Sequence, residues 1–117
     1  MTKNGQKKLK MDKKEFLKKV IEDPYAIENA DEKFKKDKEI VLAAVKGNGS
    51  VLEYVHSSLK KDKDVVIAAT SQGFHALEFA DESLKKDKKI VMDIVKKDGE
   101  ALEYAHSSLR KDKNIVL

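Results

Sequence analysis

The stretch LEYVHSSLKKDKDVVIAAT, residues 52–70, returns 50 residues later as LEYAHSSLRKDKNIVL, residues 102–117. A more distant version lies halfway between the two, so the basic interval is 25 residues and neighbouring copies alternate between two types. Self-similarity at a fixed period of 20–50 residues is the signature of a repeat architecture. The sequence therefore predicts tandem 25-residue repeats that arose by duplication of a 50-residue pair. One aspartate marks every copy: Asp12, Asp37, Asp62, Asp87 and Asp112.

Four positions of the repeat stay apolar in every copy. We interpret all four as core positions, because packing rather than solvent dictates a residue type that does not drift between copies. The four columns are Phe16, Val41, Val66, Val91 and Val116; Leu17, Leu42, Ile67, Met92 and Leu117; Ile27, Leu52, Leu77 and Leu102; and Phe34, Leu59, Leu84 and Leu109.

The copy that begins at Asp37 indicates how each repeat starts. Aspartate is a favoured N-cap, because its carboxylate accepts hydrogen bonds from the first free amides of a helix. After it, Ile40 and Ala44, and Val41 and Val45, are spaced four residues apart and form an apolar stripe. The pattern therefore predicts an amphipathic α-helix that begins just after each aspartate.

The second half of the repeat is expected to be shorter and tighter. The sequence GNG, residues 47–49, predicts a glycine turn that ends the first helix. We expect a second, shorter helix over residues 50–56, followed by a tight turn or one turn of 3₁₀ helix over residues 57–61. Neither helix can bury its apolar stripe alone, so neighbouring repeats must supply the missing surface. The predicted fold class is all-α, an α-solenoid of tandem 25-residue helix-turn-helix repeats.

The ends of the array differ from its middle. In the first unit Glu15 and Lys19 replace the apolar pair Ile40 and Ala44 of the next unit, as an N-terminal capping repeat requires. The last residues keep the apolar pattern where the chain stops, which favours self-association through the C-terminal end. We predict a basic flexible tail over residues 1–11 and a helical repeat array over residues 12–117, with units near 12–36, 37–61, 62–86 and 87–111 and a partial unit 112–117.

The positive charge of the chain is unevenly spread. Of a net charge of +4, the first 14 residues contribute +5, and the remaining 19 basic and 20 acidic residues nearly cancel. The basic character therefore belongs to the tail, which weakens a nucleic-acid interpretation of the array. The chain has no cysteine, no secretory signal pattern and no apolar run near 18 residues. We therefore expect a cytoplasmic protein without disulfides, thiolate metal sites or a membrane span.

The last repeat and the segment Leu77–Gly99 resemble a known family. Repeats of that family read Ala-Leu-x-x-Ala-Ser-x-x-Leu-Lys-x-Asp-x-Glu-Val-Val-x-x-Ala-Val-x-x-x-Gly, and the family is a bacterial and protist domain of unknown function. The leucine, aspartate and glycine columns carry the resemblance over nearly everything after Asp12. The resemblance implies an all-α repeat without known activity, and it supplies no catalytic residue. The chain departs from the family in one column, where histidine or aspartate replaces the usual serine: Asp31, His56, Asp81 and His106.

This column holds the residues that most suggest chemistry. Its histidines are two repeats apart, on the order of 20 Å at about 8–10 Å per layer, whereas a shared metal needs ligand bonds of about 2 Å. We interpret the four residues as helix caps. The serines after the histidines lack the Gly-x-Ser-x-Gly context of a nucleophile, and the glycine turn lacks the Lys-Ser/Thr of a phosphate loop. We therefore expect no enzyme and assign no catalytic, cofactor-binding or metal-binding residue.

Two further columns form the candidate partner surface. Aromatic side chains are common interface anchors, although packing against the neighbouring helix is the simpler role. A row of glutamates could bind a cationic partner, but pairing of each glutamate with a lysine of its own or the adjacent repeat is the simpler interpretation. The columns are Tyr54, Phe79 and Tyr104, and Glu53, Glu78 and Glu103 with Glu28 as their first member.

A lysine-rich corner recurs in every repeat and forms the candidate polyanion edge. A regular row of cations could bind the phosphates of nucleic acid or acidic lipids. Against this, the array is almost neutral, and no aromatic residues are interleaved with the lysines. The edge consists of Lys35, Lys36, Lys60, Lys61, Lys85, Lys86, Arg110 and Lys111.

The function that these patterns favour is a non-catalytic helical-repeat module for protein interaction or structure. Its expected partner is another protein, and no cofactor is implied. The alternative is polyanion binding, to nucleic acid or acidic lipid, through the lysine-rich edge and the basic N-terminal tail. The two differ in salt dependence, because phosphate contacts weaken steeply as salt rises.

Overall fold

The computed structural model describes residues 11–97 and 99–110, and within them every regular element is a helix. The all-α prediction is confirmed for this part of the chain. Residues 1–10 of the predicted tail, Lys111 of the predicted polyanion edge and the partial unit 112–117 lie outside the described residues.

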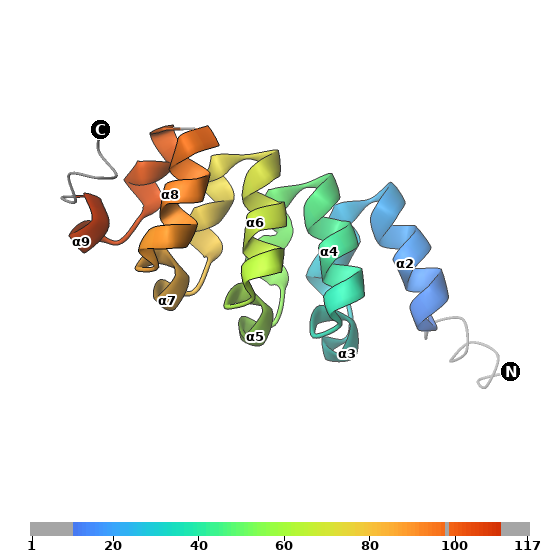
Figure 1. Cartoon of the computed structure of the whole chain (residues 1–117). Helices are drawn as coiled ribbons and strands as arrows, with labels where there is room; N and C mark the ends of the chain where they lie inside the picture. The colour runs from blue at the N-terminus through green and yellow to red at the C-terminus, as the bar shows by residue number, and fades with distance from the viewer. Residues whose placement is uncertain (1–10, 98, 111–117) are drawn as a thin grey trace, which may run out of the picture.

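Three kinds of helix alternate along the chain (Figure 1). The α layer consists of four long helices that lie side by side in chain order: α2 (Lys13–Glu22), α4 (Lys38–Gly47), α6 (Lys63–Gln72) and α8 (Lys88–Lys97). The 3₁₀ face, behind them, consists of η1 (Pro24–Asn29), η2 (Gly49–Tyr54), η3 (Phe74–Phe79) and η4 (Gly99–Tyr104). The short-helix edge consists of α3 (Glu32–Lys35), α5 (Ser57–Lys60), α7 (Glu82–Lys85) and α9 (Ser107–Arg110). The molecule measures 64 × 22 × 16 Å.

The second half of each repeat differs from the prediction. The expected short helix is a six-residue 3₁₀ helix, and the expected turn over residues 57–61 contains a four-residue α-helix. Caps at both starts explain this division. Asn48 accepts a hydrogen bond from the amide of Ser50 at the start of η2, and the ring of His56 accepts one from the amide of Ser58 at the start of α5. Each segment is too short for a longer α-helix, and 3₁₀ geometry suits such short pieces.

The predicted aspartate N-caps are confirmed at the long helices. Asp12 forms a capping box with Glu15, since each side chain accepts a hydrogen bond from the other residue's backbone amide. Asp37 accepts bonds from the amides of Glu39 and Ile40 in the first turn of α4, and Asp62 accepts the equivalent bonds from Asp64 and Val65 in α6. Asp87 accepts a bond of 3.2 Å from the amide of Ile90. These aspartates therefore fix where each repeat begins.

The helix α4 ends at the GNG sequence, as predicted, but not through a left-handed glycine. No described residue has a positive φ, so no glycine supplies a left-handed helix cap. Gly49 is buried, and a Cβ atom there would lie 2.0 Å from the carbonyl oxygen of Ala69 in the next unit. A glycine is needed at this point because the backbone of η2 passes directly against α6.

Three of the four apolar columns form the core, and the fourth does not. Wherever their side chains are described, the columns of Phe16, Ile27 and Phe34 are buried in every unit. In the fourth column Leu17, Leu42 and Met92 are only half-buried and Ile67 is 37% exposed. Adjacent helical positions differ in direction by about 100°, so a residue next to a core position points to the side of the helix and not into the core. This column was wrongly assigned to the core.

Backbone hydrogen bonds join the short-helix edge of each unit to the next. The amide at the head of α5, α7 and α9 donates to a lysine carbonyl oxygen at the end of the preceding short helix. The bonds are His56 to Lys35 (3.1 Å), Asp81 to Lys60 (2.9 Å) and His106 to Lys85 (3.1 Å). The lysine corners are therefore fixed relative to one another through the main chain, whatever side chains they carry.

A lysine clamp joins the first turns of neighbouring long helices. The lysine at the start of α2 reaches two carboxylates at the start of α4, and the lysine at the start of α4 does the same to α6. At the next junction the second carboxylate is replaced by Lys89, so the clamp is not repeated. The N–O distances are 3.1 and 2.9 Å from Lys13 to Asp37 and Glu39, and 3.0 and 2.9 Å from Lys38 to Asp62 and Asp64.

Replacing Asp62 by alanine is expected to lower stability at pH 7 by about 1–2 kcal/mol, because the N-cap of α6 and one arm of the clamp are lost together. Partial burial pushes the pKa of Asp62 upwards, but bonds from Lys38 and from the amides of Val65 and Asp64 outweigh it and hold that pKa below its ordinary 3.8. The carboxylate is thus preferred in the folded state. Its contribution is complete above pH 3.8 and is lost as pH falls through the lower folded pKa.

Urea denaturation of the parent chain and of Asp62→Ala at pH 7 and near pH 2.5 measures this difference. The gap between the two chains should narrow at the lower pH. Asp64→Ala is the matched control, because Asp64 holds an arm of the clamp but no cap, and its effect should stay within about 0.5 kcal/mol. A gap that is unchanged at low pH would contradict the assigned role of the carboxylate.

Candidate interaction surfaces

The aromatic column of the predicted partner surface lies on the 3₁₀ face. Tyr54, Phe79 and Tyr104 end η2, η3 and η4, and each is half-buried. Tyr54 and Tyr104 are each approached by a ring near the start of the preceding 3₁₀ helix. Tyr25 meets Tyr54 edge to face with ring centroids 6.4 Å apart, and His75 lies 5.5 Å from Tyr104. The column therefore packs against its neighbours, as the simpler interpretation expected, and still leaves part of each ring on the surface.

The glutamate column lies on the same face and is not neutralised. Glu28, Glu53, Glu78 and Glu103 are exposed, and none of them forms an ion pair with a described lysine or arginine. The prediction that each pairs with a lysine is therefore wrong for the described residues. The physical reason is that the 3₁₀ helices form a layer without basic residues. Their four sequences contain five glutamates and no lysine or arginine.

The glutamates act instead on the tyrosines beside them. Negative charge on Glu28, with smaller contributions from burial and from Glu53 and Tyr25, raises the pKa of Tyr54. Burial, followed by the charges on Glu103, Glu78 and Glu100, raises the pKa of Tyr104. Each tyrosine is thus held in its neutral form between carboxylates of two successive units. We call these two groups of side chains the acidic–aromatic brackets. The first bracket consists of Tyr25, Tyr54, Glu28 and Glu53. The second consists of His75, Tyr104, Glu78 and Glu103.

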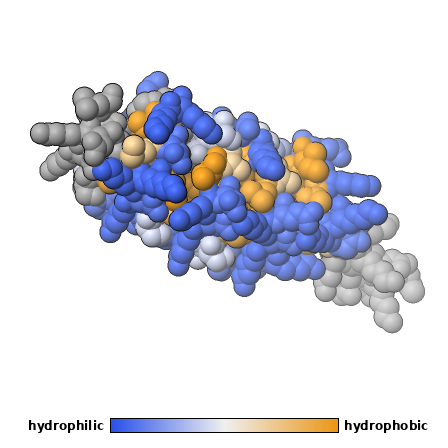
Figure 2. Space-filling model, viewed as in Figure 1, coloured by the Kyte–Doolittle hydropathy of each residue, from blue (hydrophilic) through white to orange (hydrophobic). Residues whose placement is uncertain are grey.

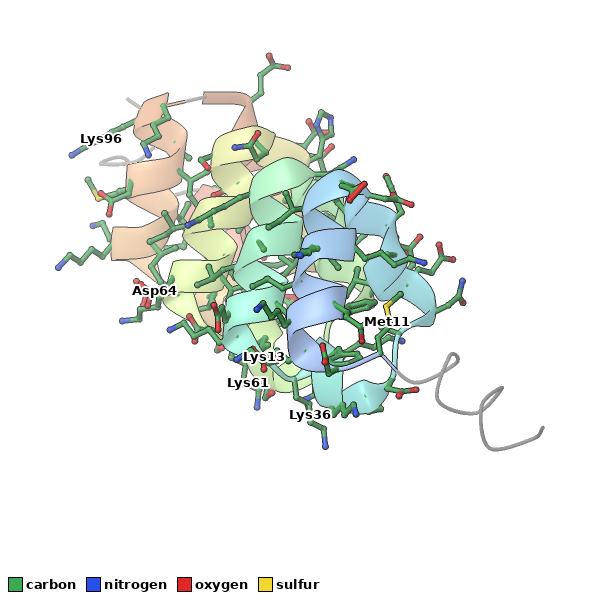
Figure 3. All side chains as sticks on the ribbon, turned by 90° about the vertical axis from the view of Figure 1, so that its right-hand side faces the viewer. Met11, Lys13, Lys36, Lys61, Asp64 and Lys96 are labelled. Atoms are coloured by element: carbon green, nitrogen blue, oxygen red, sulfur yellow. The ribbon has the colours of Figure 1, made fainter. Side chains whose placement is uncertain are left out.

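The predicted polyanion edge coincides with the short-helix edge. Lys35, Lys60 and Lys85 are half-buried, whereas Lys36, Lys61, Lys86 and Arg110 are exposed. Figure 3 shows Lys36 and Lys61 projecting from this edge of the molecule. The edge is only partly neutralised by its own acids, the one ion pair within its described helices being the 3.8 Å contact between Lys85 and Glu82.

Charge is divided between the layers even though the array is almost neutral as a whole. The sequences of the four long helices contain eleven lysines and five acidic residues, a net charge of +6. The short helices add +3, and the 3₁₀ helices carry −5 with histidine neutral. The N-cap aspartates Asp12, Asp37, Asp62 and Asp87 add four negative charges at the starts of the long helices, so the α layer with its caps carries +2 and the 3₁₀ face is the acidic one.

The column of Asp31, His56, Asp81 and His106 stands at the heads of the short helices, as predicted for caps. The carboxylate of Asp81 accepts a hydrogen bond from the amide of Ser83, just as His56 does from Ser58. Asp31 occupies the same place without a side-chain bond to its helix. Among the described residues no group of three histidines, carboxylates or cysteines could hold a metal ion.

A hollow of about 500 Å³ at the N-terminal end was not predicted. Phe16 and Phe34 stack in it with ring centroids 4.5 Å apart, and Lys19, Asp23 and Asp31 stand among its polar lining. The residues equivalent to its apolar lining in the second unit, Val41, Val51, Val55 and Leu59, are all buried. The exposed Glu15 and Lys19 beside it agree with the predicted polar cap.

No helix in the described part of the chain combines the length and the apolar character needed to cross a membrane. Comparison with known families finds three matches to a model described as Domain of unknown function (DUF4116), over residues 13–56, 37–85 and 87–117. Neither the curated proteins nor the solved structures include a match to the chain.

Proposed function

The chain belongs to the DUF4116 family, a domain of unknown function, and on that premise we propose that it is a non-catalytic protein-interaction module built as an α-solenoid of tandem 25-residue repeats. Support for the architecture comes from the element order. The helices α4, α6 and α8 begin at Lys38, Lys63 and Lys88, and each is followed by a 3₁₀ helix and a short α-helix. Units of this kind expose long surfaces that suit extended partners.

The partner that we propose for the 3₁₀ face is a protein segment rich in lysine and arginine. The observation that carries this proposal is the row of exposed glutamates without a cation beside half-exposed aromatic rings. Carboxylates form charge-assisted hydrogen bonds with guanidinium and ammonium groups, and the face of a tyrosine ring attracts the same cations. In each acidic–aromatic bracket, both attractions would act on the same cationic group of the partner.

The spacing of the brackets sets a spacing for the partner. Tyr54 and Tyr104 are two units apart, which corresponds to on the order of 20 Å at about 10 Å per packed layer. An extended chain advances by about 3.3 Å per residue, so roughly six residues span this distance. A partner that lies along the 3₁₀ face would therefore place two cationic side chains about six positions apart.

An NMR titration with two short arginine peptides tests this proposal. A Gly-Ser peptide with arginines six positions apart should bind more tightly than the same peptide with arginines three positions apart. Changing Glu28 and Glu53 to glutamine should lower the affinity for the first peptide by about tenfold, since a charge-assisted hydrogen bond contributes about 1.5–3 kcal/mol. The matched control is Lys36→Gln with Lys61→Gln on the short-helix edge, which should not weaken binding.

Equal affinity for the two peptides, or full binding by the glutamine variant, would refute the bracket mechanism. The alternative function, polyanion binding through the short-helix edge and the basic tail, predicts a different pattern. It requires tight binding of duplex DNA that Lys36→Gln and Lys61→Gln abolish and that the glutamate variants leave unchanged.

A further inference from the structure

The outward side of the α layer combines lysines with exposed aliphatic side chains. Ile21 is 63% exposed and Ile67 is 37% exposed, while Leu17, Leu42 and Met92 are half-buried. One residue of this set lies at the same position of each long helix, so the column crosses the layer from α2 to α8. Figure 2 shows apolar patches at intervals across this side, surrounded by hydrophilic side chains. The arrangement is that of separate apolar side chains on a charged surface.

The lysines around these side chains are mostly not engaged in ion pairs. The clamp uses Lys13 and Lys38 together with two of the five acidic residues of the long helices, Glu39 and Asp64, and Glu15 belongs to the capping box. That leaves Glu22 and Asp93 as the remaining acids of the long helices. Exposed lysines of these helices without an ion pair among the described residues are Lys14, Lys18, Lys46, Lys63, Lys89, Lys96 and Lys97, apart from Lys19, which lines the hollow at the N-terminal end. Figure 3 shows Lys96 pointing away from the body of the molecule.

We propose that this side of the α layer docks on a bilayer that contains anionic phospholipid. Lysines near such a surface are attracted to its negative charge, and aliphatic side chains between them can enter the boundary between headgroups and acyl chains. The acidic 3₁₀ face is repelled by the same surface, so the molecule would lie with its α layer against the lipid. A peripheral contact of this kind requires no membrane-spanning helix.

The structure favours a lipid surface over two other negatively charged partners, single-stranded nucleic acid and an acidic helix of another protein. Single-stranded nucleic acid is usually held by aromatic residues that stack on bases, but the exposed aromatic rings lie on the acidic 3₁₀ face. An acidic helix of a partner protein requires an apolar groove along its length. The gap between α6 and α8, beside Ile67 and Ile94, holds only about 20 Å³, roughly the volume of one water molecule. A bilayer needs neither stacking rings nor a groove.

Sedimentation with vesicles measures the proposed binding. The full chain should bind vesicles of phosphatidylcholine with 30% phosphatidylserine and should not bind phosphatidylcholine alone. Lys18→Gln, Lys89→Gln and Lys96→Gln combined should lower the partition coefficient about a hundredfold, at roughly fivefold for each lysine near the surface. Ile21→Ser with Ile67→Ser should lower it about tenfold, because both side chains are already exposed in the folded chain. Circular dichroism checks that every variant is folded.

One control variant and two contrary results decide whether the proposal holds. Tyr25→Ser, which removes a 46% exposed ring from the 3₁₀ face, should leave vesicle binding unchanged. The proposal is overturned if Ile21→Ser with Ile67→Ser binds vesicles as well as the parent, or if duplex DNA binds to the lysines of the α layer more tightly than the vesicles do. This inference does not depend on peptide binding by the 3₁₀ face, because the two assays use different probes and different residues.

Discussion

Replacing Gly49 by alanine is expected to destabilise the chain by about 3 kcal/mol or more, a fall of roughly 15 °C in Tm. The new Cβ would lie 2.0 Å from the carbonyl oxygen and 2.8 Å from the carbonyl carbon of Ala69. These atoms belong to the backbone of α6, which cannot rotate away as a side chain can. The overlap can be relieved only by moving η2 and α6 apart, which opens the core between two units. Thermal and urea denaturation followed by circular dichroism measure the loss.

Gly73→Ala is the matched control for this experiment. Gly73 follows α6 as Asn48 follows α4, and its backbone is extended with φ of 174°. A Cβ atom there would meet nothing within 4 Å. The expected change is within about 0.5 kcal/mol, and loss of unfolded-state freedom could make it slightly stabilising. Similar effects of the two substitutions would show that close backbone approach does not explain Gly49.

Replacing Leu77 by alanine is expected to cost about 3 kcal/mol, since burial of its side chain is complete. Leu77 is 0% exposed and lies in the main core cluster. Substitution of a buried leucine removes favourable transfer energy and leaves a cavity that the surroundings only partly fill. The free energy of unfolding from urea titration provides the measurement.

Ile67→Ala tests the difference between the two apolar columns. Both columns are apolar in every copy, but Ile67 is 37% exposed. The expected cost is below about 1 kcal/mol, because much of the side chain is already in water. If Ile67→Ala were as costly as Leu77→Ala, the fourth column would belong to the core after all.

The sequence pattern predicts the start of each repeat better than its second half. The aspartate caps and the apolar stripe of the first helix depend on local chemistry, such as the bonds from Asp37 to the amides of Glu39 and Ile40. In the second half, asparagine is a favoured N-cap and His56 was assigned as a cap, but neither signal says which type of helix follows. Asn48 and His56 each begin a new short helix, and a histidine ring is an unusual N-cap. The assignment of two types of helix was therefore reversed.

The candidate partner surface could be predicted in its residues but not in its electrostatics. Tyr54 and Glu53 are placed on the 3₁₀ face, where their columns were expected to share a surface. The error concerned the partners of the glutamates. The linear sequence shows a lysine five to seven residues from each glutamate, but the short helices place their lysines on a separate edge. Only the placement of elements in layers reveals that Glu28 and Glu53 face a tyrosine instead.

Between α6 and α8 the lysine clamp of the two earlier junctions is missing, which removes a small contribution to the coupling of these helices. Lys13 and Lys38 tie the first three long helices, whereas Lys89 stands where the next carboxylate would be. Val91, Ala105 and Leu109 beyond this junction form a small cluster apart from the main core. In a chain whose units are stabilised mainly by their neighbours, partial unfolding begins where the coupling is weakest. We therefore expect the C-terminal unit to fray first, from the small cluster inwards, because Ile90 and Ile94 still join α8 to the main core.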